Sequence, residues 1–228
     1  MENKQLLTTS KPLEMSVFFD IDAEGYDDIT REWDTEGFYK RAANVIHPTE
    51  DAVSILDLGI GTGYELPTFF ARAPNAHVTG IDLSSKMLEK LRHQYAQHLQ
   101  QLTLVQTSFL DFSFPPNTYR YVFAIAAMHH YLEDTRFTMY RKIKSTLQSD
   151  GIYIEGDKVI PLDKERQYVE RYFKLHESVN PKNDTLYHID VPCSVDTQKR
   201  LLLKAGFKSV DVFQHDPEGY NAVVVAKV

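Results

Sequence analysis

The chain has 228 residues, a formal net charge of −7, 43% hydrophobic residues and 25% charged residues. This composition is that of a globular domain long enough to bury a full core. The negative charge argues against nucleic acid as a partner, because such a partner is bound mainly through its phosphates. With no apolar run of 18 residues and no secretory signal, we expect a cytoplasmic protein without membrane contact. A single cysteine, Cys193, excludes an internal disulfide bond.

The first 50 residues are expected to form a helical cap. Residues 1–15 show no clear hydrophobic period, so we expect them to fray or to lie over the surface. Residues 17–27 read VFFDIDAEGYD and precede a segment with helical spacing of apolar residues. That segment predicts one helix containing Trp33, Phe38, Tyr39 and Ala42.

A buried strand over residues 53–58 is followed directly by glycines at 59, 61 and 63. Glycine lets a ligand lie against the main chain, and the helix that begins beyond Gly63 presents unpaired N–H groups to an anionic part of that ligand. Dinucleotide-binding loops have the spacing G-x-G-x-x-G/A, but Tyr64 stands where the third small residue would be. The spacing therefore argues against a nicotinamide-dependent dehydrogenase.

From residue 53 onward predicted strands and helices alternate, which indicates a parallel sheet covered on both faces. Further strands are expected over residues 77–82, 102–106, 121–126 and 151–155. Three helices are expected between the strands: one over 63–73, one capped by Ser84 and one capped by Asp134. Gly151 is expected to follow the end of the last of these helices. Residues 156–192 interrupt the alternation and predict an insertion with one helix. A helix capped by Ser194 and ended by Gly206, then a hairpin of strands 208–213 and 221–227 with its turn at 216–219, complete the chain.

Asp82 ends the second strand, where an α/β nucleotide site places an acceptor for ribose hydroxyls. The segment DLGIGTG followed by GIDLSSKML resembles the first two motifs of the class I S-adenosylmethionine-dependent methyltransferases. The resemblance implies an α/β fold with a Rossmann-like seven-stranded, mostly parallel sheet and an antiparallel carboxy-terminal hairpin. It also implies one domain over 1–228, with a cap at 1–50, a cofactor-binding core at 51–160, a lid at 161–192 and a final helix and hairpin at 193–228.

The resemblance also implies roles for individual residues toward S-adenosyl-L-methionine, whose product is S-adenosyl-L-homocysteine. Asp57 and the glycines would hold its methionine part, and Asp82 its ribose. The remaining cofactor-binding candidates are Tyr26, Gly59, Gly61, Gly63, Leu83, Met87, Ser108, Phe109 and Ala124. Ser108 stands where the family commonly has an acid that contacts adenine, and Asp111 is the alternative for that contact. Packing of the cap and of the core is an equally good explanation of Tyr26 and Met87.

Two adjacent histidines follow the strand at 121–126. Imidazole titrates near neutral pH, so one of them could take a proton from an acceptor, and we name His129 as the catalytic candidate. Neighbouring side chains diverge, so at most one of the pair is expected to face the site. No metal site is expected, because no clear carboxylate or cysteine set accompanies the pair.

Methyl transfer to a small-molecule acceptor is the function that the sequence favours. Aromatic residues of the cap and the insertion are the candidates for substrate contact: Phe18, Phe19, Tyr26, Trp33, Tyr168, Tyr172, His176, Tyr187 and His188. Two alternatives stay open: an enzyme of the same fold that modifies RNA, for instance a transfer-RNA base, and a non-catalytic protein that binds the cofactor. The sequence carries no signal for an oligomeric state.

Overall fold

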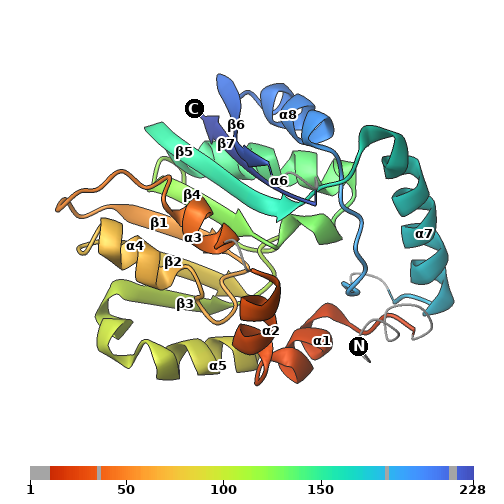
Figure 1. The fold of residues 1–228 in the computed structure, drawn as a ribbon, viewed down its shortest axis with the longest axis horizontal. Helices are drawn as coiled ribbons and strands as arrows, with labels where there is room; N and C mark the ends of the chain where they lie inside the picture. Colours follow the sequence, from red (N-terminus) through yellow and green to blue (C-terminus); the bar gives the residue numbers. More distant parts are fainter. Residues whose placement is uncertain (1–10, 35–36, 183–184, 216–219) are drawn as a thin grey trace.

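The computed structural model describes residues 11–34, 37–182, 185–215 and 220–228, which form one seven-stranded sheet flanked by helices (Figure 1). The strand order is β3-β2-β1-β4-β5-β7-β6. The strands are β1 (Ser54–Leu58), β2 (His77–Asp82), β3 (Leu102–Gln106), β4 (Tyr119–Ile125), β5 (Leu147–Lys158), β6 (Ser209–His215) and β7 (Asn221–Lys227). The first five strands are parallel to one another, whereas β7 is antiparallel to both β5 and β6. The expected fold class is thereby confirmed.

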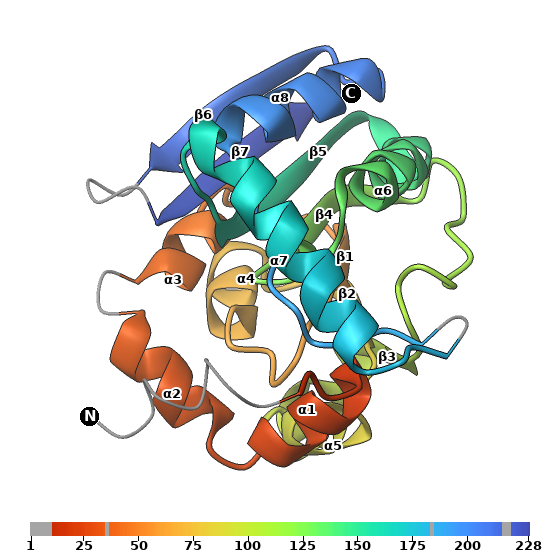
Figure 2. The same ribbon diagram turned by 90° about the vertical axis from the view of Figure 1, so that its right-hand side faces the viewer.

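Helices cover both faces of the sheet. One face carries α6 (Glu133–Thr146) and α8 (Val195–Lys204), and the other carries α3 (Phe38–Ala43), α4 (Leu66–Arg72) and α5 (Ser85–Gln94) (Figures 1 and 2). Successive side chains of a strand point to opposite faces. In β1, Leu56 and Leu58 accordingly pack in the core cluster that contains Tyr140 of α6, and Ile55 packs in the cluster that contains Phe69 of α4. A 3₁₀ helix, η1 (Ala96–Gln101), joins α5 to β3.

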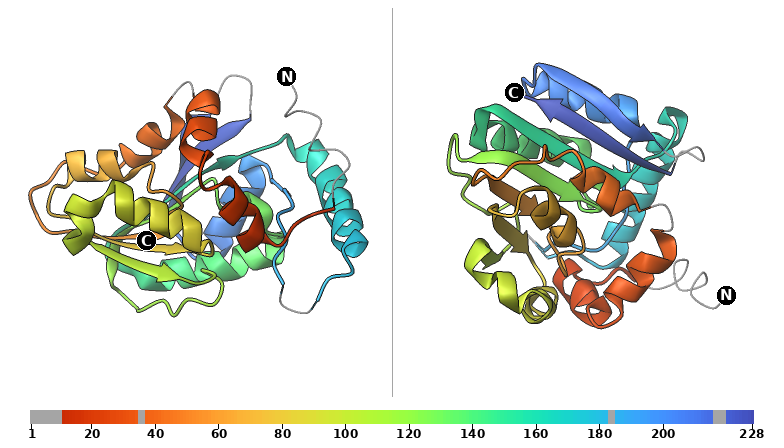
Figure 3. Two further views of the ribbon diagram at one scale, coloured as in Figure 1. Left: turned by 90° about the horizontal axis from the view of Figure 1, so that it is seen from below. Right: turned by 60° about the vertical axis from the view of Figure 1, so that its left-hand side comes forward.

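The cap consists of α1 (Met15–Asp22), α2 (Tyr26–Trp33) and α3. The prediction of one helix from Trp33 to Ala42 is wrong, because the helical path ends at Asp34 and Gly37 has a left-handed φ of +69°. Residues 1–10, expected to fray, lie outside the described residues, and Met15 is buried. Helix α1 packs against α5 at the lower edge of the molecule (Figure 3, right).

Helix starts and ends follow local side-chain chemistry in most places. Ser84 and Ser194 cap α5 and α8 as predicted, each accepting a hydrogen bond from the backbone N–H three residues later. Gly206 follows α8 with a φ of +98°, which is also as predicted. Asp134 does not cap α6, which begins at Glu133; its carboxylate lies in the first turn, near the positive end of the helix dipole. The hairpin turn at 216–219 lies outside the described residues.

Strand β5 begins earlier than predicted. Helix α6 ends at Thr146 and the chain turns directly into the strand at Leu147, so Gly151 lies within β5. The pairing register of β4 with β5 shifts between Tyr119 and Tyr121, which accommodates the extra residues. The longer strand extends to Lys158 and brings its last residues to the edge where β4 also ends.

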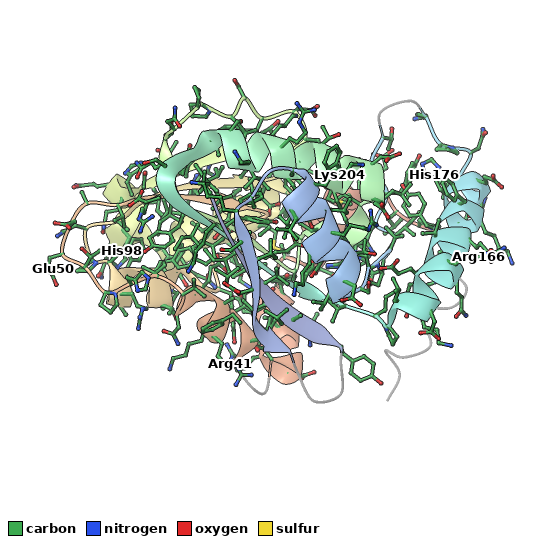
Figure 4. The ribbon with its side chains drawn as sticks, turned by 90° about the horizontal axis from the view of Figure 1, so that it is seen from above. Arg41, Glu50, His98, Arg166, His176 and Lys204 are labelled. Atoms are coloured by element: carbon green, nitrogen blue, oxygen red, sulfur yellow. The ribbon has the colours of Figure 1, made fainter. Side chains whose placement is uncertain are left out.

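The insertion after β5 contains η3 (Leu162–Lys164) and α7 (Glu165–Ser178), and α7 lies beyond the carboxyl ends of the central strands (Figures 1 and 2). Figure 4 labels Arg166 and His176 on α7, at the opposite end of the molecule from Glu50 and His98. The insertion is tied to the cap, since the backbone N–H of Met15 donates to the carbonyl of Leu186 at 2.8 Å. Among the described helices, none is long and apolar enough to cross a membrane.

Candidate functional site

The loop between β1 and α4 lies against the neighbouring strand end. Gly59 and Gly63 have φ angles of +80° and +75°. A Cβ atom on Gly59 would lie 3.0 Å from Cβ of Ala127, and one on Gly63 would lie 2.6 Å from Cδ1 of Leu66. The backbone angles and the close approach of neighbouring atoms both require glycine at these two positions. The main chain of the loop therefore carries no side chain of its own at Gly59 and Gly63.

Asp82 holds this loop in place. Its Oδ2 atom accepts a hydrogen bond from the backbone N–H of Gly61 at 2.8 Å, and its Oδ1 atom accepts one from Ser84 at 2.8 Å. Burial raises the pKa of Asp82 to about 6, and the two backbone hydrogen bonds oppose part of that rise. The carboxylate at the end of β2 is therefore fixed beside the glycine loop.

A pocket lies between the glycine loop, the carboxyl ends of β2 and β4, and the cap. Its walls consist of Met15, Phe19, Tyr26, Gly59, Gly61, Asp82, Leu83, Met87, Phe109, Ala126, Ala127, His130 and Tyr131. The structure therefore brings together seven of the residues predicted to bind the cofactor: Tyr26, Gly59, Gly61, Asp82, Leu83, Met87 and Phe109. This edge of the sheet is where α/β folds bind ligands.

The other four predicted cofactor residues do not line this pocket in the described structure. Asp57 and Ala124 are buried within β1 and β4, and Gly63 lies at the far end of the loop. Ser108 accepts a hydrogen bond on its Oγ atom from the backbone N–H of Leu110 at 3.1 Å, which holds the turn after β3. The small residues that reach the pocket from β4 are Ala126 and Ala127, immediately after the strand.

A pair of buried carboxyl groups lies behind the loop. Asp57 is 1% exposed and Glu65, the residue before α4, is 3% exposed. Burial raises the pKa of Asp57 to about 7, and burial together with the charge of Asp57 raises the pKa of Glu65 well above its ordinary value. Among the described residues, Oδ2 of Asp57 and Oε1 of Glu65 have no hydrogen-bond partner. Glu65 is not among the residues predicted from the sequence, although an acid directly after a glycine loop is a usable signal.

The cap is fixed over the pocket by two aspartates. Asp20 of α1 accepts a hydrogen bond from Oγ of Ser84 at 2.6 Å. Asp27 of α2 accepts one from Oγ1 of Thr62 at 2.5 Å and forms a salt bridge with Lys90 at 3.2 Å. These bonds join α1 to the start of α5, and α2 to the glycine loop and to α5.

A second pocket adjoins the first beneath α7. It is lined by Met15, Leu110, His130, Tyr131, Leu132, Thr135, Tyr172, Thr185, Leu186 and Tyr187. Met15, His130 and Tyr131 belong to both pockets. Tyr172 stacks with His176 on α7, with ring centroids 5.7 Å apart.

The aromatic residues predicted to contact substrate are divided between several places. Phe19 and Tyr26 line the first pocket, and Tyr172 and Tyr187 line the second. His188 stacks on Phe18 with ring centroids 3.5 Å apart. Tyr168 lines a separate cavity between α7 and the start of α8. The side chain of Trp33 lies outside the described residues.

The two histidines lie on η2 (Met128–His130), directly after β4. His130 lines both pockets, whereas His129 is absent from the described lining of either. Instead Nδ1 of His129 lies 2.6 Å from Oδ1 of Asp157 at the end of β5. Burial, reinforced by His129, lowers the pKa of His130 to about 4, so His130 is neutral at physiological pH. The structure thus places His130, rather than the predicted His129, at the pocket wall.

Asp190, in the segment that returns from the insertion, completes this cluster. Its Oδ1 atom lies 3.7 Å from Nε2 of His129 and 3.3 Å from Nδ1 of His130. Its Oδ2 atom lies 2.9 Å from Nζ of Lys158. Burial alone would raise the pKa of Asp190, but the imidazoles and the ammonium of Lys158 hold it well below its ordinary value. The sequence analysis missed Asp157 and Asp190, because neither is near the histidines in the chain.

Comparison with known sequences identifies relatives. A family model described as a methyltransferase domain matches residues 55–151. The carboxy-S-adenosyl-L-methionine synthase of Campylobacter fetus is 29% identical over 166 residues, which cover 69% of this chain and 70% of that protein. The enzyme of the same name from Nautilia profundicola is 22% identical over 218 residues, which cover 89% of this chain and 92% of that protein.

Comparison with solved structures identifies the same fold. A putative O-methyltransferase from Nostoc punctiforme superposes with a TM-score of 0.70 and 18% identity, covering 97% of this chain and 64% of that one. The complex of DhpI with SAH superposes with a TM-score of 0.68 and 17% identity, covering 93% of this chain and 94% of that one. In its matched domain, its sheet order and its glycine loop beside Asp82, the chain is similar to the class I S-adenosylmethionine-dependent methyltransferases.

Proposed function

We propose that this protein transfers the methyl group of S-adenosylmethionine to a small-molecule acceptor held beneath α7. One observation carries this proposal. The pocket beside the glycine loop shares Met15, His130 and Tyr131 with the second, aromatic pocket. A donor in the first pocket and an acceptor in the second would therefore lie next to each other, beside the same three side chains.

The residues of the first pocket fit the chemical groups of the donor. Asp82 presents carboxylate oxygens at the end of β2, where ribose hydroxyls would donate to them. Behind the glycine loop, outside the lining of this pocket, the unpartnered oxygens of Asp57 and Glu65 would accept hydrogen bonds from the ammonium of the methionine part. Phe109 and Met87 offer apolar surfaces suited to the adenine ring.

When bound, S-adenosylmethionine supplies a methyl carbon that is already activated by its positive sulfur. The protein's task is then to align the acceptor with that carbon and to exclude water. The cap and the insertion contribute to that exclusion, since their backbones are joined at Met15 and Leu186. His130, on the wall of both pockets, would contact the acceptor and help to position it beside the donor.

The second pocket indicates a class of acceptor. Its walls carry three tyrosines, Tyr131, Tyr172 and Tyr187, and among the described residues that line the two pockets there is no lysine or arginine. An anionic acceptor would enter without a cationic partner, which is costly in a partly buried site. We therefore infer a neutral, partly aromatic acceptor.

The relatives named carboxy-S-adenosyl-L-methionine synthase suggest a second candidate, synthesis of a carboxylated form of the cofactor. The similarity to one of them over 89% of this chain favours it. The absence of lysine and arginine from the described pocket walls opposes it, because the product carries an additional carboxylate. Mass spectrometry of the nucleoside released from the purified protein separates the two candidates: the mass of the carboxylated cofactor would support the second.

Turnover with labelled donor tests the leading candidate. The protein would be incubated with S-adenosylmethionine carrying an isotopically labelled methyl group and a panel of neutral phenols, heteroaromatic amines and aliphatic alcohols, with transfer RNA in a parallel reaction. We expect label in at least one small molecule, and loss of that transfer in Asp82→Ala. Label found in transfer RNA alone would replace this proposal with an RNA-modifying activity. Donor binding with no transfer to any member would favour a non-catalytic protein.

A further inference from the structure

His129, His130 and Asp190 form a compact cluster behind the wall that the two pockets share. The histidines lie on η2 after β4, and Asp190 lies in the segment that returns from the insertion. Each of the three residues offers a ligand atom that lies within 4.8 Å of the other two. Two imidazoles and a carboxylate are a set of ligands that binds divalent transition metals in proteins.

Second partners orient two of these three residues. The bond between Nδ1 of His129 and Asp157, at 2.6 Å, leaves Nε2 of His129 on the side of Asp190. Lys158 holds Oδ2 of Asp190 at 2.9 Å, so that Oδ1 faces the imidazoles. The N–H of Val191 donates to the carbonyl of His129 at 2.7 Å and fixes the two segments to each other. A histidine that donates to a carboxylate while its other nitrogen faces inward is the usual arrangement around a bound metal.

Two atoms of the cluster lack a partner. Although Nδ1 of His130 and Oδ1 of Asp190 are 3.3 Å apart, neither has a hydrogen-bond partner among the described residues. His130 is only 4% exposed, and its Nδ1 atom is buried. Burying a polar atom without a hydrogen-bond partner is unfavourable. A cation between the imidazole and the carboxylate would satisfy both atoms at once.

The spacing of the atoms suits such a cation. Ligand atoms about 2.0–2.1 Å from a tetrahedral metal lie roughly 3.3 Å from one another. The carboxylate oxygen of Asp190 lies 3.3 Å and 3.7 Å from the two imidazole nitrogens that face it. We propose that Nε2 of His129, Nδ1 of His130 and Oδ1 of Asp190 bind one divalent transition-metal ion.

Three protein ligands leave at least one coordination position open. Because His130 lines both pockets, that position would be available to an oxygen or nitrogen atom of the acceptor, a role that rests on the proposed methyl transfer. Imidazole nitrogens select Zn²⁺ and its neighbours over Mg²⁺, which requires oxygen ligands. The site therefore takes Zn²⁺ rather than Mg²⁺.

This inference is tested by titrating the full chain with Zn²⁺ in a calorimeter. The protein carries no affinity tag and is first treated with a chelator to remove bound metal. We expect one saturable Zn²⁺ per chain, which Mg²⁺ does not displace. Asp190→Asn and His129→Gln should abolish that site, and Asp157→Asn should weaken it roughly 10- to 100-fold, because Asp157 acts through His129. Co²⁺ bound in place of Zn²⁺ should give visible absorption bands in the wild type that Asp190→Asn lacks.

The matched control is His98→Gln, since His98 lies at the opposite end of the molecule from α7 (Figure 4). This variant should bind Zn²⁺ as the wild type does. No saturable site in the wild type, or equal loss in His98→Gln and His129→Gln, would overturn the inference. A titration with S-adenosylhomocysteine on the same samples keeps the two proposals separate. If the protein binds the donor but not Zn²⁺, only the metal-site proposal is rejected. If it binds Zn²⁺ but not the donor, only the proposed function is rejected.

Discussion

At the scale of single residues, Asp82 connects the fold to the proposed donor site. Its two oxygens hold the N–H groups of Gly61 and Ser84, and its carboxyl group lines the pocket. Burial raises its pKa to about 6, so the ionised form that would accept hydrogen bonds from ribose hydroxyls is present above that pH and is lost below it.

The affinity for S-adenosylhomocysteine should therefore fall as the pH is lowered through 6. Calorimetry between pH 5 and pH 8 measures this, and Asp82→Asn should bind more weakly and lose the transition near pH 6. Any transition that remains in the variant should lie near pH 7, the pKa to which burial raises Asp57. A wild-type affinity that is constant over the whole range contradicts the role given to Asp82.

A comparison of two ligands tests the roles of Asp57 and Glu65. Both carboxyl groups are buried with one unpartnered oxygen each. If they hold the ammonium of the methionine part, Asp57→Asn should weaken the binding of S-adenosylhomocysteine by roughly tenfold or more. This loss corresponds to about 1.5–3 kcal/mol, the contribution of a hydrogen bond to a charged group. Methylthioadenosine lacks that ammonium and should bind the variant as it binds the wild type. Asp82→Asn should weaken the binding of both ligands. If Asp57→Asn weakened the binding of both ligands equally, this assignment would be refuted.

At the scale of elements, the predicted strands and caps depend on local signals. The β1 strand, the glycine loop and the Ser84 cap are encoded within a few residues each, and the sequence predicted them. The early start of β5 at Leu147 depends on a shift in its pairing register with β4. No residue pattern near Leu147 predicts that shift. The break of the cap into α2 and α3 depends on Gly37, whose left-handed φ could have been suspected from its residue type alone.

Helix α2 supplies the sharpest test of the cap. Asp27 joins it to Thr62 of the glycine loop and to Lys90 of α5. Asp27→Asn should raise the dissociation rate of S-adenosylhomocysteine about tenfold, equivalent to about 1.4 kcal/mol, because the cap would open more readily over the bound ligand. Stopped-flow displacement measures this rate.

The neighbouring residue is the matched control. Asp28 lies on the same helix, its side chain is 79% exposed, and it pairs with Arg31 on α2 itself. Asp28→Asn changes the charge of α2 by the same amount and should leave the dissociation rate unchanged, since exposed pairs contribute little. Equal acceleration in both variants would mean that net charge, and not the cap contact, governs release.

At the scale of the whole molecule, the site is assembled from segments far apart in the chain. The cap, the ends of β2 and β4, the end of β5 and the segment after α7 all meet at one edge of the sheet. Seven of the predicted cofactor residues line the first pocket, and most of them lie in short local motifs at the glycine loop and at the end of β2. The sequence did not predict that His129 would meet Asp157 and Asp190, or that His130 would face the pocket, because chain crossovers and the register of β5 decide those contacts.

The central claim is that the pocket between the glycine loop and the cap binds the methyl donor. The most direct test of this claim is a calorimetric titration of the full chain with S-adenosylhomocysteine. The titration is repeated on Asp82→Ala, and with reduced nicotinamide dinucleotide as a second ligand. The account predicts saturable one-to-one binding of S-adenosylhomocysteine, at least tenfold weaker in Asp82→Ala, and no binding of the dinucleotide. Binding that Asp82→Ala leaves unchanged, or preference for the dinucleotide, would contradict it.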